Sequence, residues 1–230
     1  MSIRERIEEV KERIEKACLR SGRKPEEVRL MGVSKFHGPA AVEEAIRGGL
    51  SLFGENRVQE AREKFPSLRA AYKDLELHMI GALQRNKAKN AVAVFDGVQS
   101  LDRDELISAL GTLSAPREKP LGVLLELHTG EESKSGYAGP DLLFRAAELV
   151  LSFPGLRLFG LMTMAPYTRD QGPIRSSFRA LVKARDLLQN RFPGADLSCL
   201  SMGMSNDFEI AVEEGSTLLR IGTLIFGERQ

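Results

Sequence analysis

Apolar residues recur along this chain with two alternating spacings. Near the N-terminus they follow one another at steps of three and four residues, which predicts an amphipathic helix over residues 2–20. A continuous apolar run, VRLMGVS at 28–34, comes next and is typical of a short buried strand. The same succession of a short apolar run and a longer periodic segment then repeats to the end of the chain.

These apolar runs predict eight strands, and helices are expected between them. The strands lie at 28–34, 51–54, 77–80, 98–101, 122–127, 156–162, 197–200 and 216–221. The helices lie at 39–47, 57–64 and 84–94, after Asp102, from Pro140, at 174–191 and from Asn206 to Gly215. Two of the helix starts have the spacing of a capping box, Asp102 with Glu105 and Asn206 with Glu209.

Strand–helix units of roughly 25–30 residues in regular succession favour a parallel (β/α)8 barrel of the TIM type. The helix over 2–20 is then an extra N-terminal element, and residues 1–230 form a single domain. A doubly wound open sheet is the alternative architecture, but the regularity of the units favours closure.

The stretch LSMGMSNDFEIAVEEGSTLLRIGT at 200–223 has the features of a phosphate site. Its first turn contains Ser205, and a second turn, Gly222-Thr223, follows the last strand. Free backbone N–H groups and a helix N-terminus favour an anion. In TIM-type barrels a phosphate often binds after strands seven and eight, where both turns fall. On this stretch alone, two ordinary turns remain the alternative.

Two cationic side chains adjoin these turns. Lys35 ends the first strand, which neighbours the eighth in a closed barrel, so its amine and a phosphate together indicate a phosphorylated aldehyde. Pyridoxal 5'-phosphate (PLP) is the commonest such cofactor. Arg220 lies between the apolar residues Leu219 and Ile221. It either faces the pyridine nitrogen and keeps it unprotonated, or it is an exposed arginine at a strand edge; Lys35 is otherwise a solvated loop residue.

The chain resembles the pyridoxal-phosphate homeostasis proteins, which are single-domain relatives of the alanine racemase barrel. The resemblance extends over essentially the whole chain, in order. It rests on GVSK at 32–35, FGENRVQE at 53–60, HMIGALQRNK at 78–87, SLDR at 100–103, GEESKSG at 130–136, GLMTMAP at 160–166 and LSMGMSNDFEIAVEEGSTLLRIGTLIFGER at 200–229.

This resemblance implies a role for each candidate site residue. Lys35 would bear PLP through a Schiff base, Asn56 would lie beside the ring, and Arg220 would lie near the pyridine nitrogen. The residues implied around the phosphate are Ser201, Ser205, Gly222 and Thr223. The fifth strand departs from the pattern, because it ends in Glu126-Leu127-His128 where a Val-Asn ending is expected. The roles of Glu126 and His128 stay open.

Composition narrows the classes of partner. The 33 basic and 32 acidic residues give a formal net charge of +1, which disfavours nucleic acid as a partner. The densely charged N-terminus is neither a signal peptide nor a membrane span, so we expect a soluble, cytoplasmic protein. We also expect a monomer. Cys18 and Cys199 match no metal or redox spacing, and His37 and His128 have no partner at metal spacing. A lone histidine such as His78 is more typical of a hydrogen-bonded core group.

Two functions from different classes remain. The resemblance implies a non-catalytic protein that stores, buffers or delivers PLP, with apo PLP-dependent enzymes as acceptors. The alternative is an amino-acid racemase or another PLP enzyme, which needs acid–base groups on both faces of the substrate. Two-domain racemases take the second group from a tyrosine of another domain, and this chain offers only Tyr137 and Tyr167 near the right rim. An enzyme for phosphorylated sugars would leave Lys35 and Arg220 unexplained.

Overall fold

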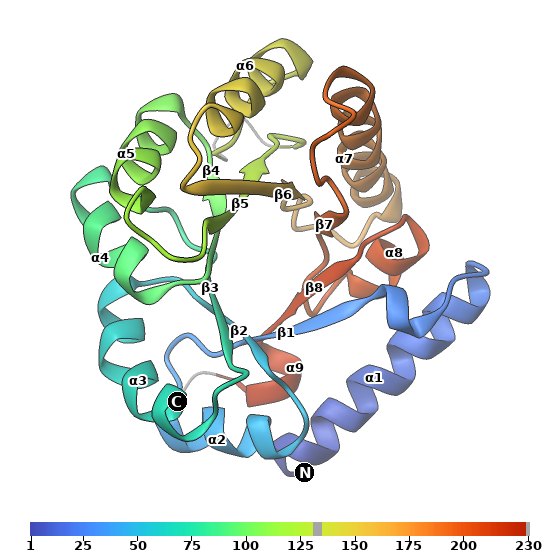
Figure 1. Cartoon of the computed structure of the whole chain (residues 1–230). Helices are drawn as coiled ribbons and strands as arrows, with labels where there is room; N and C mark the ends of the chain where they lie inside the picture. Colours follow the sequence, from blue (N-terminus) through green and yellow to red (C-terminus); the bar gives the residue numbers. More distant parts are fainter. Residues whose placement is uncertain (131–134, 229–230) are drawn as a thin grey trace.

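The computed structural model describes residues 1–130 and 135–228, and within these ranges eight parallel strands close into a barrel in chain order. Helices surround the barrel (Figure 1). The predicted (β/α)8 fold is therefore confirmed. The GEESKSG motif at 130–136 lies partly outside the described residues.

Each strand predicted from the apolar runs is present, with its ends shifted by a few residues at most. The strands are β1 (Arg29–Val33), β2 (Leu52–Glu55), β3 (Glu76–Met79), β4 (Gly97–Leu101), β5 (Leu121–Glu126), β6 (Leu156–Met162), β7 (Cys199–Ser201) and β8 (Leu218–Ile221). Pairing of β1 with β8 closes the barrel, with Gly32 opposite Ile221.

The helices agree less closely with the sequence-based expectations. They are α1 (Ile3–Arg20), α2 (Pro39–Arg47), α3 (Val58–Ala71), α4 (Ala88–Val94), α5 (Asp104–Ser114), α6 (Pro140–Leu151), α7 (Gln171–Arg191), α8 (Phe208–Glu213) and α9 (Thr223–Phe226), with 3-10 turns η1 (Pro25–Glu27) and η2 (Arg85–Lys87). Helix α3 continues past its expected end at residue 64, because Phe65 and Leu68 extend its buried face. The short helix α9 was not predicted.

Both predicted capping boxes are wrong. Arg103 is the N-cap residue of α5 and makes no side-chain capping bond, while Asp102 accepts a bond of 2.5 Å from the Arg103 guanidinium. Asp207 is the N-cap residue of α8, a helix of six residues. Glu209 instead pairs with Arg13 of α1, at 3.3 Å. Asp102 and Glu209 therefore each pair with an arginine and do not form a capping box.

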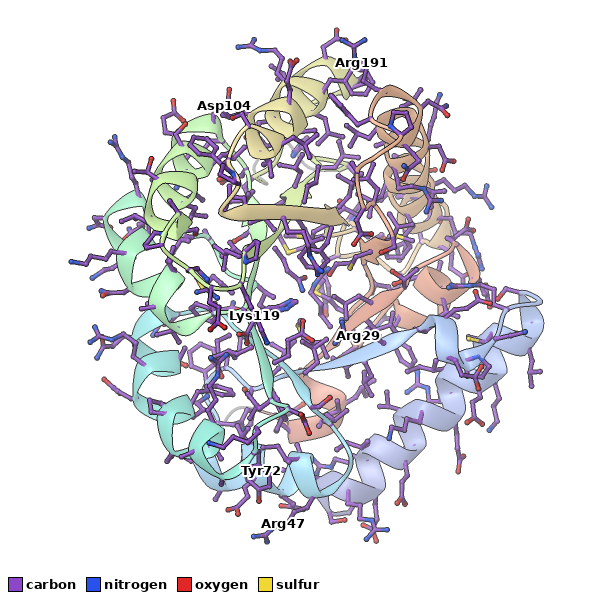
Figure 2. The ribbon with its side chains drawn as sticks, viewed as in Figure 1. Arg29, Arg47, Tyr72, Asp104, Lys119 and Arg191 are labelled. Carbon is purple, nitrogen blue, oxygen red and sulfur yellow. The ribbon has the colours of Figure 1, made fainter. Side chains whose placement is uncertain are left out.

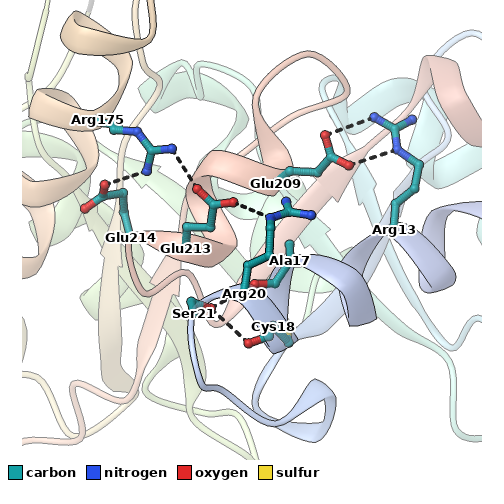
Figure 3. Close-up of polar contacts among 9 residues, drawn as sticks. All are labelled: Arg13, Ala17, Cys18, Arg20, Ser21, Arg175, Glu209, Glu213 and Glu214. Carbon is teal, nitrogen blue, oxygen red and sulfur yellow. Dashed lines mark hydrogen bonds and ion pairs between the residues drawn. The ribbon is translucent and has the colours of Figure 1, made fainter.

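Ion pairs connect the N-terminal helix α1 to α8, and α8 to α7 (Figure 3). Arg20 of α1 bonds Glu213 at 2.9 Å, and Arg175 of α7 bonds the same carboxylate at 2.7 Å. These side chains are partly exposed, so each pair adds little to stability. Together with the buried stripe of α1, they hold α8 and the turn before it against the barrel.

Candidate functional site

The structure brings the ends of β1, β2 and β8 together at one rim of the barrel. Lys35 follows β1, and Asn56 directly follows β2, which pairs with β1. Gly222 follows β8 and lies so close to β1 that an added Cβ would be 3.3 Å from the Val33 carbonyl oxygen. Lys35, Asn56 and the Gly222-Thr223 turn therefore occupy neighbouring strand ends. A cavity of about 350 Å³ opens beside Asn56 on the side of α3 and η2, away from Lys35 and the Gly222-Thr223 turn, and its lining includes Arg57, Gln84 and Lys87.

Lys35 lies in a tight turn with an unusual backbone. The His37 N–H donates to the Ser34 carbonyl at 3.1 Å, which closes a turn around Lys35 and Phe36. Phe36 has φ 68°, a value that the third residue of a type II turn requires and that glycine usually provides. For a bulky residue this conformation costs about 1–2 kcal/mol. Something outside the turn must therefore hold it.

Helix α3 supplies that support. The Phe36 N–H donates to Glu60 at 3.2 Å, and the Lys64 ammonium donates to the Ser34 carbonyl at 2.8 Å. Glu60 and Lys64 are four residues apart and thus lie on one face of the helix. The turn that presents Lys35 is therefore held from one side by two charged side chains.

A buried ion pair lies next to this turn. Glu55 accepts hydrogen bonds from Lys64 and from the Ser34 hydroxyl, both at 2.6 Å. The Glu55 side chain is fully buried and that of Lys64 is 7% exposed. Burial raises the pKa of Glu55, although the bonds from Lys64 and Ser34 act in the opposite direction. Sequence reasoning missed this pair; its signal was a lysine on the apolar face of a helix.

Arg220 lies inside the barrel and is not an exposed edge residue. One guanidinium nitrogen donates to the Ser201 hydroxyl at 2.6 Å and another to the Thr163 carbonyl at 2.8 Å. Burial lowers the pKa of Arg220 to about 10, while the carboxylates of Asp207 and Glu126 act to raise it. The guanidinium is therefore still a cation at neutral pH.

The side chain of Ser201 points into the barrel. Its hydroxyl contacts Arg220 and donates to Gln99 at 2.7 Å. The resemblance implied that Ser201 would lie around a phosphate, but its hydroxyl is engaged with Arg220 and Gln99. Gln99 was also missed from the sequence, where the only signal was a polar residue in a short buried strand.

Two turns at the ends of β7 and β8 offer hydrogen-bond donors. Ser205 is half-buried in the first turn. A hydrogen bond of 2.6 Å from the Met204 N–H to the Asp207 carboxylate closes this turn. Thr223 is exposed and begins α9, so its N–H and that of Leu224 have no carbonyl within the helix. These N–H groups and hydroxyls form a donor set that suits an anion.

The remaining candidates have structural explanations or stay open. His78 is buried and hydrogen-bonded to Glu76 and Gln99, as expected for a core histidine. Glu126 is 3% exposed and accepts a bond from Ser135 at 2.8 Å, and burial raises its pKa. The buried Nδ1 of His128 has no hydrogen-bond partner among the residues that the structure describes. Among the described residues, no group of three or more His, Cys, Asp or Glu side chains is arranged to bind a metal ion.

Membrane insertion finds no support in the helices. In the two ranges that the structure describes, none of them is both long enough and apolar enough to cross a bilayer.

Comparison with known proteins gives full-length matches. The family model described as "Alanine racemase, N-terminal domain" matches residues 6–230. The pyridoxal phosphate homeostasis protein of Aquifex aeolicus is 42% identical over 230 residues, covering 100% of both chains. A Bifidobacterium adolescentis structure, described as an unknown protein, has a TM-score of 0.91 and 34% identity over 97% of this chain and 94% of that chain.

A second similar structure was solved with a ligand bound. PipY of Synechococcus elongatus PCC7942, described with PLP bound, has a TM-score of 0.84 and 34% identity. The match covers 98% of this chain and 100% of that chain.

Replacing Lys64 by methionine should destabilise the protein. The Lys64→Met variant leaves Glu55 buried without its cation, so the free energy of unfolding should fall by about 3–5 kcal/mol at pH 8. Loss of Lys64 also raises the pKa of Glu55 further, because it removes an interaction that lowers it. When the pKa of a carboxyl group is higher in the folded protein than in the unfolded chain, stability falls as the pH rises above the pKa of the unfolded chain. The difference in unfolding free energy between the wild-type protein and Lys64→Met, measured by urea unfolding, should therefore become smaller toward pH 4.5.

The control is Arg62→Met, an exposed residue of the same helix, which should change the free energy of unfolding by less than about 0.5 kcal/mol. Adding Glu55→Gln to Lys64→Met should recover most of the loss. A Lys64→Met protein as stable as Arg62→Met at pH 8 would contradict the role assigned to the pair.

Proposed function

Because the chain belongs to the family of the pyridoxal phosphate homeostasis proteins, we propose that it binds PLP and stores, buffers or delivers it to apo-enzymes in the cytoplasm. One observation carries the proposal. Lys35, the buried Arg220 and a set of anion-binding donors lie at or near the ends of β1, β7 and β8, in a chain that is 34% identical to PipY, which was solved with PLP bound.

The residues at this rim fit the parts of PLP. The Lys35 amine would hold PLP as a Schiff base with the aldehyde carbon, formed with loss of water. Ser205, Gly222 and Thr223 donate hydrogen bonds to the phosphate, at the end of β7 and the start of α9. Asn56 would lie beside the ring. When bound, PLP supplies an electrophilic aldehyde and an electron-withdrawing ring.

Arg220 limits the chemistry that this site supports. A guanidinium has only donors, so a ring nitrogen facing Arg220 acts as an acceptor and carries no proton of its own. Arg220 also keeps its charge at neutral pH, since its pKa is about 10. An unprotonated pyridine is a weak electron sink, which favours holding the cofactor over catalysing with it.

The rim tyrosines favour a carrier over a racemase. The Tyr137 hydroxyl donates to Asp104 at 3.0 Å, and burial raises its pKa, so it is a poor proton donor at neutral pH. Tyr167 is 87% exposed at the rim. Neither tyrosine has the environment of a tuned acid or base, which racemisation requires opposite the lysine.

Replacing Lys35 tests the covalent bond. The Lys35→Ala variant should lose the Schiff-base absorbance and release PLP on dialysis. It should still bind pyridoxine 5'-phosphate, which has an alcohol in place of the aldehyde, because the phosphate contacts remain. Lys183→Ala, an exposed lysine of α7, is the control and should retain PLP. Unchanged absorbance in Lys35→Ala would exclude Lys35 as the covalent residue.

Replacing Thr223 tests the phosphate contact. Thr223→Val keeps the shape of the side chain and removes one hydroxyl. Loss of a charge-assisted hydrogen bond of about 1.5–3 kcal/mol should raise the Kd of pyridoxine 5'-phosphate roughly 10- to 150-fold. Binding of unphosphorylated pyridoxal should not change. Thr112→Val on α5 is the control, and equal Kd values for both variants would argue against this phosphate site.

Carrier and racemase differ in a measurable reaction. The PLP-loaded protein should transfer PLP to an excess of an apo PLP-dependent enzyme, followed by the activity that the acceptor gains. In deuterated water it should exchange the α-proton of alanine slowly or not at all. Rapid exchange with inversion, on the order of 1–10³ per second, would instead establish the racemase.

A further inference from the structure

A chain of hydrogen bonds crosses the barrel interior from Arg220 to Glu76. Arg220 contacts the Ser201 hydroxyl at 2.6 Å, and Ser201 contacts the Gln99 oxygen at 2.7 Å. The Gln99 amide nitrogen lies 2.8 Å from Nδ1 of His78, and Nε2 of His78 lies 2.7 Å from Glu76. The chain joins β8, β7, β4 and β3, and every member except Glu76 is at most 5% exposed.

The chemistry of the side chains fixes the direction of every bond. Arginine can only donate, so the Ser201 oxygen accepts from it and the single hydroxyl hydrogen goes to Gln99. Gln99 therefore presents its oxygen to Ser201 and its NH2 group to His78. Nδ1 of His78 must then be an acceptor without a hydrogen, and the ring hydrogen lies on Nε2, where it is donated to Glu76.

The two ends of the chain carry opposite charges. The hydrogen bond from His78 is the largest of the effects that lower the pKa of Glu76, so Glu76 is a carboxylate. Arg29, labelled in Figure 2, donates to the other Glu76 oxygen at 2.5 Å. All donors point from the Arg220 cation toward the Glu76 anion, and bonds aligned in this way polarise one another.

We propose that Ser201, Gln99 and His78 are positioning residues that fix the orientation of the Arg220 guanidinium before any ligand binds. Without them the hydrogen bond to the Thr163 carbonyl remains, and the guanidinium can rotate about its terminal bonds. The consequence for the cofactor rests on the proposed function. An orientation set in advance lets Arg220 meet the ring nitrogen without ordering it at the moment of binding.

The first measurement uses the ligand-free wild-type protein. The sequence has three histidines, so ¹⁵N NMR resolves the ring nitrogens of His78, with His37 and His128 as references. At pH 7.5 we expect a hydrogen on Nε2 of His78 and none on Nδ1. A hydrogen on Nδ1, alone or together with one on Nε2, would overturn the proposal, because Gln99 could not then donate to it.

The second measurement tests positioning through two variants, Ser201→Ala and Gln99→Met. In the wild-type protein the Arg220 guanidinium should give separate Nη signals, because its rotation is restricted, and these should merge in both variants. Ser114→Ala is the control, because this serine of α5 is equally buried but lies outside the hydrogen-bond chain. Separate Nη signals in both variants, or merged signals in the control, would overturn the proposal.

The binding experiment separates this proposal from the proposed function. The Kd of pyridoxine 5'-phosphate should rise about tenfold in Ser201→Ala and Gln99→Met. The Kd should be unchanged in Ser114→Ala. Equal Kd values in all three would show that the orientation of Arg220 does not matter to the ligand. Absence of binding to the wild-type protein would refute the proposed function, while the ligand-free NMR results would stand.

Discussion

A charged guanidinium buried inside the barrel is the constraint on which the site depends. A buried charge costs several kcal/mol unless hydrogen bonds satisfy it, and Arg220 obtains these bonds from Thr163 and Ser201. Satisfying Ser201 in turn requires Gln99, and Gln99 requires His78. Polar residues therefore occupy a space that aliphatic side chains usually fill in such barrels. The apolar filling is split into two small clusters, one around Met31, Leu52 and Leu218 and one around Leu124, Phe159 and Met162.

A second departure from simple packing lies at the turn that follows β1. Phe36 has a backbone conformation that suits glycine, and the pair of Glu55 and Lys64 is buried where apolar side chains would be less costly. The Phe36 conformation is part of the turn that carries Lys35, and Lys64 of the ion pair helps to hold that turn. Strained backbone and buried charges tend to gather at functional sites, where the surrounding structure compensates for them. Here the strained backbone and the buried ion pair lie next to Lys35.

The sequence predicted the barrel because the alternation of apolar runs and periodic segments depends only on local spacing. Lys35 and Arg220 stood out because each differs in kind from the apolar residues before it. The partners of these residues could not be predicted. Gln99 and Ser201 are 102 residues apart and meet only when the barrel closes. Glu209 was predicted to cap its own helix but pairs with Arg13, 196 residues away, which a local pattern does not show.

The most direct test of the account is the location of the covalent bond to PLP. The PLP-loaded protein would be reduced with borohydride, digested and mapped by mass spectrometry. The account predicts a single pyridoxyl-modified peptide, with the modification on Lys35. Modification of another lysine in place of Lys35, or no modified peptide from a protein that retains PLP, would contradict it.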